Sequence, residues 1–265
     1  MTDRPAWVPD SINTELPSAA RVYDYLLGGG HNFAVDRVVG EKVLLALPNG
    51  GQIAGSNRAF LRRAVLFMID QGITQFLDLG SGIPTVGNVH EIAQQADPTA
   101  RVVYVDYDEV AVTHSELLLQ GNDNATVVAA DATRPERVLS APAVRKMLDF
   151  DKPVGLLMVA VLHFVPDEKK PHEVLARYID ALPSGSLVAL SHLTADAKPA
   201  EMAAVVEAMK NSRDPMYFRS HAEFSGMFGG LEMLEPGVVS APNWRPEVDY
   251  DTSPDDVYVG LARKA

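Results

Sequence analysis

QFLDLGSGIPT, the stretch from Gln75 to Thr85, decides the fold, because an apolar run ends there in an acid and two glycines. Gly80 and Gly82 lack a Cβ, so the backbone can turn tightly and a ligand can lie against it. We expect free backbone amides to face that ligand ahead of a helix that starts near Pro84. The pattern predicts a buried strand that leads into a nucleoside-binding turn.

A second predicted strand follows and also ends in an acid. RVVYVDYD, Arg101 to Asp108, is mainly apolar up to Asp106, which lies 106 − 82 = 24 positions after Gly82. In nucleotide-binding βαβ units, a carboxylate about 20 residues beyond the glycines binds the ribose diol. Asp106 is therefore the predicted ribose ligand.

The glycine turn departs from the dinucleotide pattern GxGxxG, since Thr85 stands where the third small residue belongs. A dinucleotide also needs room and amides for its pyrophosphate. Asp78, just before the turn, would repel a pyrophosphate but can face an amino group; the alternative is that it only caps the turn. A ligand with adenosine and no phosphate fits these residues, and S-adenosylmethionine is such a ligand.

A third acid follows a third short strand. ATVVAADAT, Ala125 to Thr133, ends in Asp131 and Ala132. The Asp131 carboxylate can accept a hydrogen bond from an adenine amino group. It can also be a turn acid ahead of a helix, because 133–136 has the spacing of a capping box with Pro135 just inside. The two roles are compatible.

A fourth apolar strand leads into a loop that contains His163. PVGLLMVAVLHFVPD, Pro153 to Asp167, would place this loop over the ligand, because ligands bind at the carboxyl ends of the strands in open α/β sheets. His163 is our first candidate for a general base. The alternative is a hydrogen-bonded loop histidine that only shapes the pocket.

Strands and helices alternate from Gln75 onward, which predicts an α/β fold: a seven-stranded, mostly parallel sheet with helices on both faces. The last two strands, Leu231 to Leu234 and Val257 to Ala262, would form an antiparallel hairpin at the sheet edge. Residues 1–70 precede this pattern and are predicted to form an N-terminal helical cap or lid. Residues 71–265 would form the ligand-binding domain.

The predicted cap contains two helices within residues 17–37, separated by a triple glycine at 28–30. Because these glycines follow a helix and not a strand, they fit a flexible helix C-cap better than a phosphate cradle. His31, Tyr23 and Asp24 lie beside this break and are our second choices for catalytic residues in a lid. The alternative is a solvated polar helix face.

The composition narrows the class of protein. A chain of 265 residues with 47% hydrophobic and 22% charged residues is typical of a globular protein. It has no apolar run of about 18 residues, and its first residues lack a signal-peptide pattern, so we expect a cytoplasmic protein without a membrane partner. The net charge of −12 disfavours nucleic acids. Cysteine is absent and the 7 histidines show no HxxxH or HExxH spacing, so no metal site is expected.

Several blocks together resemble one bacterial family of S-adenosyl methyltransferases, formerly known as a domain of unknown function. The blocks are, in order, ARVYDYLLGGGHNFAVDR, NRAFLRRAV, QFLDLGSGIPT, VVYVDYD, VAVLHFVPD and GGLEMLEPGVVSAPNWRP. The resemblance covers nearly the whole chain. It implies a class I methyltransferase fold whose last strand is antiparallel, with S-adenosylmethionine at the carboxyl ends of the first strands.

The resemblance also implies which residues contact the donor, although Pro84 replaces a glycine that many other methyltransferases have. The expected contacts are Asp78, Gly80, Ser81 and Gly82 around the methionine part, Asp106 at the ribose, Asp131 with Ala132 at the adenine, and Tyr107 and Ala160 beside them. The implied activity is in-line methyl transfer to the oxygen or nitrogen of a small-molecule acceptor. The alternatives are a non-catalytic module that binds S-adenosylmethionine or S-adenosylhomocysteine and, less favoured, a nicotinamide-dependent oxidoreductase. The sequence does not indicate an oligomeric state.

Overall fold

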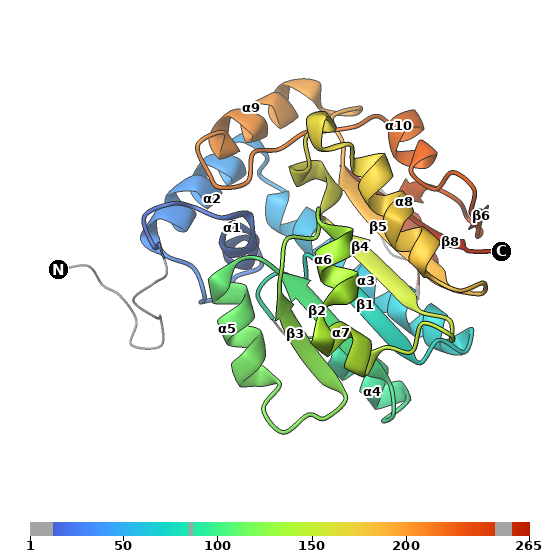
Figure 1. Cartoon of the computed structure of the whole chain (residues 1–265). Helices are drawn as coiled ribbons and strands as arrows, with labels where there is room; N and C mark the ends of the chain where they lie inside the picture. The colour runs from blue at the N-terminus through green and yellow to red at the C-terminus, as the bar shows by residue number, and fades with distance from the viewer. Residues whose placement is uncertain (1–12, 85–86, 247–255) are drawn as a thin grey trace.

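An eight-stranded sheet forms the centre of the protein (Figure 1). The structure is a computed structural model and describes residues 13–84, 87–246 and 256–265. The strand order is β3-β2-β1-β4-β5-β8-β6, and β7 pairs with β8 outside this path. The strands are β1 (Gln75–Leu79), β2 (Arg101–Asp106), β3 (Ala125–Ala129), β4 (Gly155–Val159), β5 (Leu187–Leu193), β6 (Glu232–Met233), β7 (Val239–Ser240) and β8 (Val257–Arg263).

The strand directions confirm the predicted mixed sheet. Strands β1 to β5 are parallel to one another, whereas β8 runs antiparallel to β5, β6 and β7. The predicted edge hairpin is confirmed by the pairing of Met233 with Ala262. The predicted count of seven strands is wrong, because Val239 and Ser240 add an eighth. A strand of two residues is too short to show any periodicity in a sequence.

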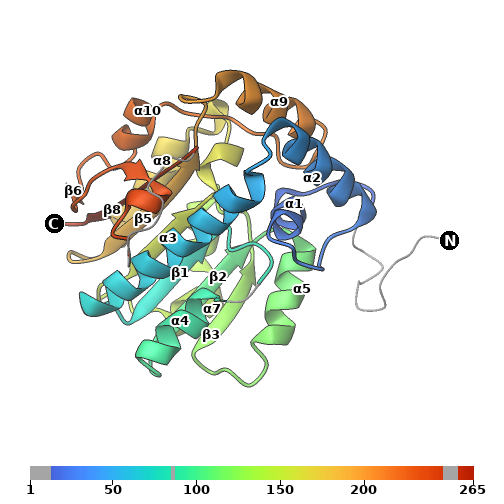
Figure 2. The same cartoon turned by 180° about the vertical axis from the view of Figure 1, so that it is seen from behind.

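Helices cover both faces of the sheet (Figures 1 and 2). One face carries α3 (Gly50–Asp70) and α4 (Val89–Ala96), and the other carries α6 (Pro135–Ser140), α7 (Pro142–Met147) and α8 (Pro171–Ala181). Helix α5 (Glu109–Leu118) packs beside β3. Helix α10 (His221–Gly226) lies on the side of the sheet that carries β8 and β6 (Figure 1). Within the described residues, no helix has the length and apolar character needed to cross a bilayer.

The strand residues alternate between two buried cores. Phe76 belongs to the core shared with α3 and α4, whereas the next residue, Leu77, belongs to the core shared with α8. Both side chains are fully buried. This burial on both faces explains why the strands are apolar throughout instead of alternating with polar residues.

Three helices lie together over the carboxyl ends of the parallel strands: α1 (Ala19–Leu26), α2 (Ala34–Ala46) and α9 (Pro199–Met209). We call them the roof helices. The helices predicted within residues 17–37 are confirmed, and the Ser18 side chain caps α1 by accepting from the Arg21 amide. Helix α3 lies within residues 1–70 but shares its core with the sheet. The division into residues 1–70 and 71–265 stays a prediction.

Two predicted helix starts are wrong. A helix does not begin near Pro84, because α4 begins at Val89. The capping box expected at 133–136 is not formed, since α6 has no side-chain cap. The amide and hydroxyl of Thr133 instead donate to Oδ1 of Asp131, at 2.8 and 2.7 Å. The carboxylate therefore orders the turn, while Pro135 begins the helix as predicted.

A buried guanidinium links α1 and α2 to the residue that follows β2. Arg21 of α1 is 3% exposed. Its Nε lies 2.9 Å from Oδ2 of Asp36 in α2, and its Nη1 lies 3.3 Å from Oδ2 of Asp108. Asp108 also caps α5, because its Oδ1 accepts from the Val110 amide at 2.9 Å. The polar residue Arg21 is therefore buried and links three elements, contrary to the solvated face considered from the sequence.

Replacing Arg21 by methionine is expected to lower the free energy of unfolding by about 3–5 kcal/mol, because two buried carboxylates would lose their counter-charge. Urea unfolding followed by circular dichroism measures this. Arg177→Met is the control, because Arg177 is exposed and pairs with Glu136 at 3.6 Å on the surface, where a loss of only about 0–1 kcal/mol is expected. Equal losses for both variants would contradict the role given to Arg21.

Candidate active site

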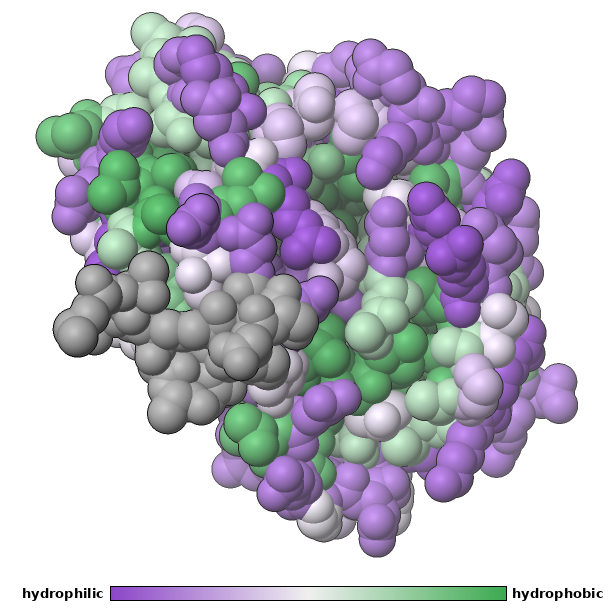
Figure 3. Space-filling model, turned by 60° about the vertical axis from the view of Figure 1, so that its left-hand side comes forward, coloured by the Kyte–Doolittle hydropathy of each residue, from purple (hydrophilic) through white to green (hydrophobic). Residues whose placement is uncertain are grey.

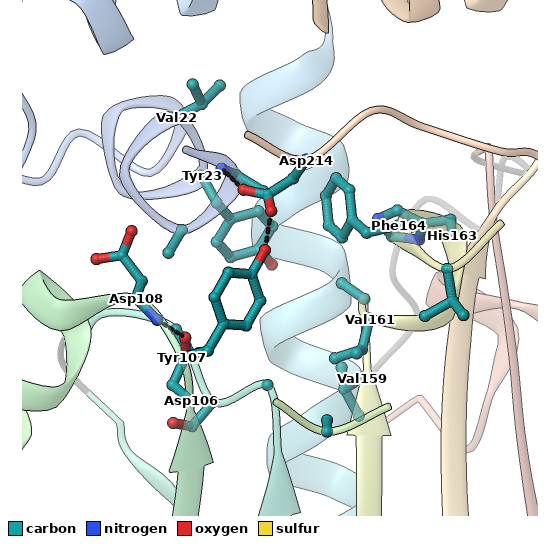
Figure 4. Close-up of a pocket in the computed structure, with 18 of the residues that line it drawn as sticks. Val22, Tyr23, Asp106, Tyr107, Asp108, Val159, Val161, His163, Phe164 and Asp214 are labelled. Atoms are coloured by element: carbon teal, nitrogen blue, oxygen red, sulfur yellow. Dashed lines mark hydrogen bonds between the residues drawn. The ribbon is translucent and has the colours of Figure 1, made fainter. Parts of the chain in front are cut away.

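One cavity of about 970 Å³ lies between the carboxyl edge of the sheet and the roof helices. On the face seen in Figure 3, hydrophobic residues lie in recesses between hydrophilic ones. The close-up in Figure 4 shows Tyr23 and Phe164 on the roof side and Asp106 and Val159 on the sheet side. The residues predicted from the sequence that line this cavity are Tyr23, Asp78, Gly80, Ser81, Gly82, Asp106, Tyr107, Asp131, Ala132, Ala160 and His163.

The glycine turn has the predicted left-handed backbone, with φ of 68° at both Gly80 and Gly82. A Cβ on Gly80 would lie 2.5 Å from a methyl group of Val161, so this position needs glycine for packing as well. The expectation of free amides is wrong for this turn, because the Gly80 and Ser81 amides donate to the carbonyl of Val105 and the Gly82 amide donates to Asp106. Thr85, which replaces the third small residue, lies outside the described residues.

Asp106 is held in place by two backbone amides. The Gly82 amide donates to its Oδ2 at 2.7 Å, and the Asp108 amide donates to its Oδ1 at 2.8 Å. Burial raises the pKa of Asp106 to about 6, although these two hydrogen bonds lower it. Each carboxylate oxygen keeps a second lone pair that can accept from a ligand hydroxyl. A ribose diol matches this arrangement.

Asp78 is a buried carboxyl group that receives no hydrogen bond from the part of the chain that the structure describes. Burial raises its pKa to about 7; the positive charge of Arg58 lowers the pKa and Asp106 raises it further. Arg58 lines the same cavity and donates from Nη2 to the carbonyl of Gly87 at 2.9 Å. The buried Asp78 carboxyl group and the Arg58 guanidinium together fit a ligand that carries both an ammonium and a carboxylate, as the methionine part of S-adenosylmethionine does.

The predicted adenine contacts lie farther along the edge. Asp131 is partly buried, and its Oδ2 lies 4.0 Å from Nε of Arg134. The carbonyl of the buried Ala132 accepts from the hydroxyl of Tyr178 at 2.9 Å. Because Thr133 uses only Oδ1 of Asp131, the turn role is compatible with a contact to an adenine amino group through the other oxygen.

A chain of hydrogen bonds crosses the cavity wall and joins β4, β5, α3 and α1. The Ala160 amide donates to Oγ of Ser191 at 2.8 Å, and this hydroxyl donates to Oδ1 of Asn57 at 2.6 Å. Nδ2 of Asn57 donates to the hydroxyl of Tyr23, which donates to the carbonyl of Ala54, both at 3.0 Å. Burial raises the pKa of Tyr23, so its phenol remains neutral and serves as a link instead of a base.

His163 lines the cavity but is unsuited to the role of general base. Its Nδ1 accepts from the Leu193 amide at 3.3 Å, so the neutral ring carries its proton on Nε2. Burial lowers the pKa of His163 well below its usual value, and the nearby His192 and Arg219 lower it further. The side chain is therefore a neutral ring that can donate a hydrogen bond from Nε2 at physiological pH.

The other two candidates from the sequence, His31 and Asp24, do not line the cavity. The His31 ring packs on His114 of α5, with 3.8 Å between ring centroids. Asp24 is buried, and its Oδ2 accepts from the amide of His31 and from Nδ2 of Asn32, both at 2.8 Å. Asp24 therefore holds the triple-glycine loop, and the structure does not bring this pair to the site.

Sequence reasoning missed the loop that closes the cavity between α9 and α10. The Tyr107 hydroxyl contacts Oδ1 of Asp214, whose Oδ2 accepts from the Ala19 amide at the start of α1 at 2.7 Å (Figure 4). The Arg213 guanidinium lies 4.2 Å above the Tyr107 ring. No short motif marks Arg213 or Asp214, because their partners are distant in the sequence. Asn57 and Arg58 were detectable only as part of the NRAF block.

Among the residues that the structure describes, no group of three His, Cys, Asp or Glu side chains could hold a metal ion. The site instead combines a glycine turn, a ribose-type acid on the next strand, a buried acid beside a base, and an antiparallel last strand next to β5. These features define a class I methyltransferase that uses S-adenosylmethionine.

The comparison with protein families agrees with this assignment. Residues 5–265 match the sequence profile of the S-adenosyl methyltransferase family. The chain belongs to this family, which confirms the resemblance noted in the sequence, and its cofactor is S-adenosylmethionine. No protein of curated function is significantly similar to the chain in sequence.

Solved structures show the same fold. A family protein of the domain-of-unknown-function type from Streptomyces avermitilis MA-4680 is 38% identical, with a TM-score of 0.91 over 95% of this chain and 99% of the other. A proposed methyltransferase from Thermobifida fusca YX is 37% identical, with a TM-score of 0.92 over 98% and 99%. Magnesium protoporphyrin IX methyltransferase from Synechocystis PCC 6803, solved with S-adenosylhomocysteine, shares the fold at 16% identity, with a TM-score of 0.56 over 92% and 93%.

Donor binding is expected to strengthen as the pH rises through 7. Asp78 has a raised pKa of about 7, and a donor ammonium favours its ionised form, so binding near pH 6 should release a proton and weaken by up to about tenfold per pH unit below 7. Asp106, with a pKa of about 6, acts in the same direction. Calorimetry with S-adenosylhomocysteine in two buffers of different ionisation enthalpy measures the proton release. In the Asp78→Asn variant, only the proton release due to Asp106 should remain. An affinity of the unaltered protein that does not change with pH would show that Asp78 does not contact the ammonium.

Proposed function

We propose that this methyltransferase acts on a small molecule and methylates an oxygen or nitrogen atom. The observation that carries the proposal is that one cavity of about 970 Å³ joins the donor residues to an apolar space beneath the roof helices. Pockets for one small ligand measure roughly 300–1,000 Å³. A cavity at the upper end of that range accommodates a donor together with a second small molecule.

The donor would lie along the carboxyl ends of β1, β2 and β3. Asp78 would bind its ammonium and Arg58 its carboxylate, Asp106 would bind the ribose, and Asp131 with Ala132 would contact the adenine. When bound, S-adenosylmethionine supplies a methyl group on a positively charged sulfur, which becomes a neutral thioether as an acceptor lone pair bonds to the methyl carbon. The protein contributes alignment and the exclusion of water.

The acceptor atom would lie near the carboxyl end of β4, between Ala160, His163 and the hydroxyl of Tyr23. His163 would donate a hydrogen bond from Nε2 to the acceptor atom and orient it. Neither His163 nor Tyr23 is suited to act as a base. The pKa of His163 is lowered and its neutral ring carries the proton on Nε2, whereas the pKa of Tyr23 is raised, so its phenol stays protonated. We therefore infer that these two side chains orient the acceptor and that neither of them takes up the proton of a hydroxyl acceptor.

Further observations support a small acceptor. The net charge of −12 disfavours a nucleic acid. Two enzymes of this fold are named for small acceptors: magnesium protoporphyrin IX methyltransferase and human N-acetylserotonin methyltransferase, the latter solved with S-adenosylmethionine. A cytoplasmic location stays part of the proposal and rests on composition alone. A nicotinamide dinucleotide is disfavoured, because the buried Asp78 would lie against its pyrophosphate.

Calorimetric titration with S-adenosylmethionine, S-adenosylhomocysteine and NAD tests the donor site. The first two should bind saturably and NAD should not. Asp106→Asn should weaken both by roughly 10- to 100-fold, because a buried hydrogen bond to a charged group contributes about 1.5–3 kcal/mol. Asp123→Asn on the exposed surface is the control and should change nothing. Binding of NAD alone would contradict the assignment.

Transfer itself is tested by incubating the protein with methyl-labelled S-adenosylmethionine and a panel of small hydroxyl and amine compounds. Formation of a labelled product with one class of acceptor, and none with RNA or DNA, is the expected outcome. Label transferred to nucleic acid would overturn the small-acceptor proposal.

A further inference from the structure

The loop that follows β4 carries His163, and a second buried histidine lies directly against it. His163 belongs to the 3₁₀ turn Leu162–Phe164, whereas His192 lies in β5. Their side chains are 2% and 0% exposed, and the two rings meet edge to face with 5.4 Å between their centroids. Nothing in the proposed function uses His192 or the residues that hold it.

The partners of His192 allow it only one neutral form. Its Nδ1 lies 2.5 Å from the carbonyl of Leu193, which can only accept, so Nδ1 carries the proton. Its Nε2 lies 3.1 Å from Nη1 of Arg219, which can only donate, so Nε2 is the unprotonated nitrogen. Burial lowers the pKa of His192 to about 4 and the charge of Arg219 lowers it as well, although the Leu193 carbonyl and the Glu223 carboxylate raise it. His192 is therefore a neutral ring with a fixed proton position.

Leu193, the last residue of β5, connects the two histidines. Its carbonyl accepts from Nδ1 of His192, and its amide donates to Nδ1 of His163 at 3.3 Å. The proton of the neutral His163 ring is therefore on Nε2. This nitrogen makes no hydrogen bond within the described residues, yet it is not one of the unpartnered atoms that the protein encloses completely. Because His163 lines the cavity, its Nε2 proton faces that cavity.

The arginine that contacts His192 also holds the loop that carries His163. Arg219 is 6% exposed and lies two residues before α10. Its Nη1 donates to the carbonyl of Leu162 and its Nη2 donates to the carbonyl of Val165, both at 2.9 Å. These two carbonyls lie on either side of His163 in the chain. One planar guanidinium thus fixes both ends of the short turn.

A backbone contact beside Arg219 strengthens this attachment. The amide of Tyr217 donates to the carbonyl of His163 at 2.7 Å. Segment 217–219 therefore binds the carbonyls of three residues in the loop, although it is more than 50 positions away in the sequence. Arginine suits this position because its guanidinium has five donors in one plane and keeps its charge, whereas a lysine ammonium is a single point.

The charge of Arg219 acts in the same direction as its hydrogen bonds. Its ion-pair partner among the described residues is Asp167, whose side chain is 88% exposed, so water screens that carboxylate. Burial lowers the pKa of His163, and His192 and Arg219 lower it further. A protonated His163 would lose the hydrogen bond from Leu193, because both ring nitrogens would then be donors. It would also place a positive charge near the positively charged sulfur of the donor.

We propose that Arg219 is a positioning residue of the acceptor site. It fixes the proton of His192 on Nδ1 and holds the loop after β4, and through both it keeps His163 as a neutral ring whose Nε2 donates toward the acceptor atom. Arg219 itself is not among the described residues that line the cavity. This inference rests on the proposed function, in which His163 orients the acceptor.

Nuclear magnetic resonance of the ring nitrogens tests the proposal on the full-length protein labelled with ¹⁵N-histidine. The method shows which nitrogen of each ring carries the proton and the pH at which both do. His163→Gln and His192→Gln assign the two rings by the loss of their signals. In the unaltered protein, the proton should be on Nε2 of His163 and on Nδ1 of His192. A proton on Nε2 of His192 would overturn the proposal, because Arg219 could not donate to that nitrogen.

Two substitutions of Arg219 separate positioning from simple packing. In Arg219→Met, which removes the charge and the donors, the pKa of His192 should rise by at least about one unit, and His163 should show a mixture of tautomers because its loop is no longer held. Arg219→Lys keeps the charge and one donor, so the pKa of His192 should stay within about half a unit of the unaltered protein. Equal effects of methionine and lysine, or no effect of methionine, would contradict the role of Arg219.

Arg177→Met is the matched control, because it makes the same change at an exposed arginine of α8 and should leave both rings as they are. Binding of S-adenosylhomocysteine to each variant shows that it is folded. Its affinity should stay within about threefold of the unaltered protein, since Asp78 and Asp106 end other strands. If the unaltered protein does not bind S-adenosylhomocysteine, the proposed function fails. If it binds and the two rings differ from the expectation, only the present inference fails.

Discussion

The buried guanidinium of Arg21 is the interaction on which the site depends. It bridges Asp36 of α2 and Asp108, the residue that caps α5 directly after the ribose strand. A parallel sheet buries both faces but leaves its carboxyl edge open. The bridge holds α1 and α2 over that edge, so the cavity lies between these helices and the sheet. Because all three groups are buried, the attachment is strong only while every charge keeps its partner.

The cavity that results is electrostatically divided. The sheet side has Asp78, Arg58 and Asp106, whose charges match a zwitterionic amino acid joined to a ribose. The raised pKa of Asp78, about 7, shows that the protein alone compensates this carboxylate poorly. The roof helices contribute mainly apolar side chains to the lining, and the loop after α9 adds Arg213 and Asp214.

The histidines show how environment decides the role of a side chain. His163 and His31 were both candidates because histidine titrates near neutral pH. In the fold, His163 accepts a backbone hydrogen bond and is surrounded by His192, Arg219 and apolar groups, which disfavour its protonated form. His31 instead packs against His114 of α5, away from the cavity lining. A general base is not required when the methyl group is already activated, so the site needs orientation more than proton transfer.

The sequence by itself determined the features that depend on neighbouring residues. Gly80 and Gly82 form the predicted turn, Asp106 ends its strand, and the apolar strands form the expected parallel sheet, because these patterns are local. Only the tertiary structure decided the rest: the ion network of Arg21, the position of Arg58, and the pairing of Asn57 with Ser191, which are 134 residues apart. Their partners meet only after the chain has folded, and no spacing in the sequence encodes that distance. The same reason explains why the sequence predicted the donor, which binds local turns, while the acceptor space became visible only where separate helices pack together.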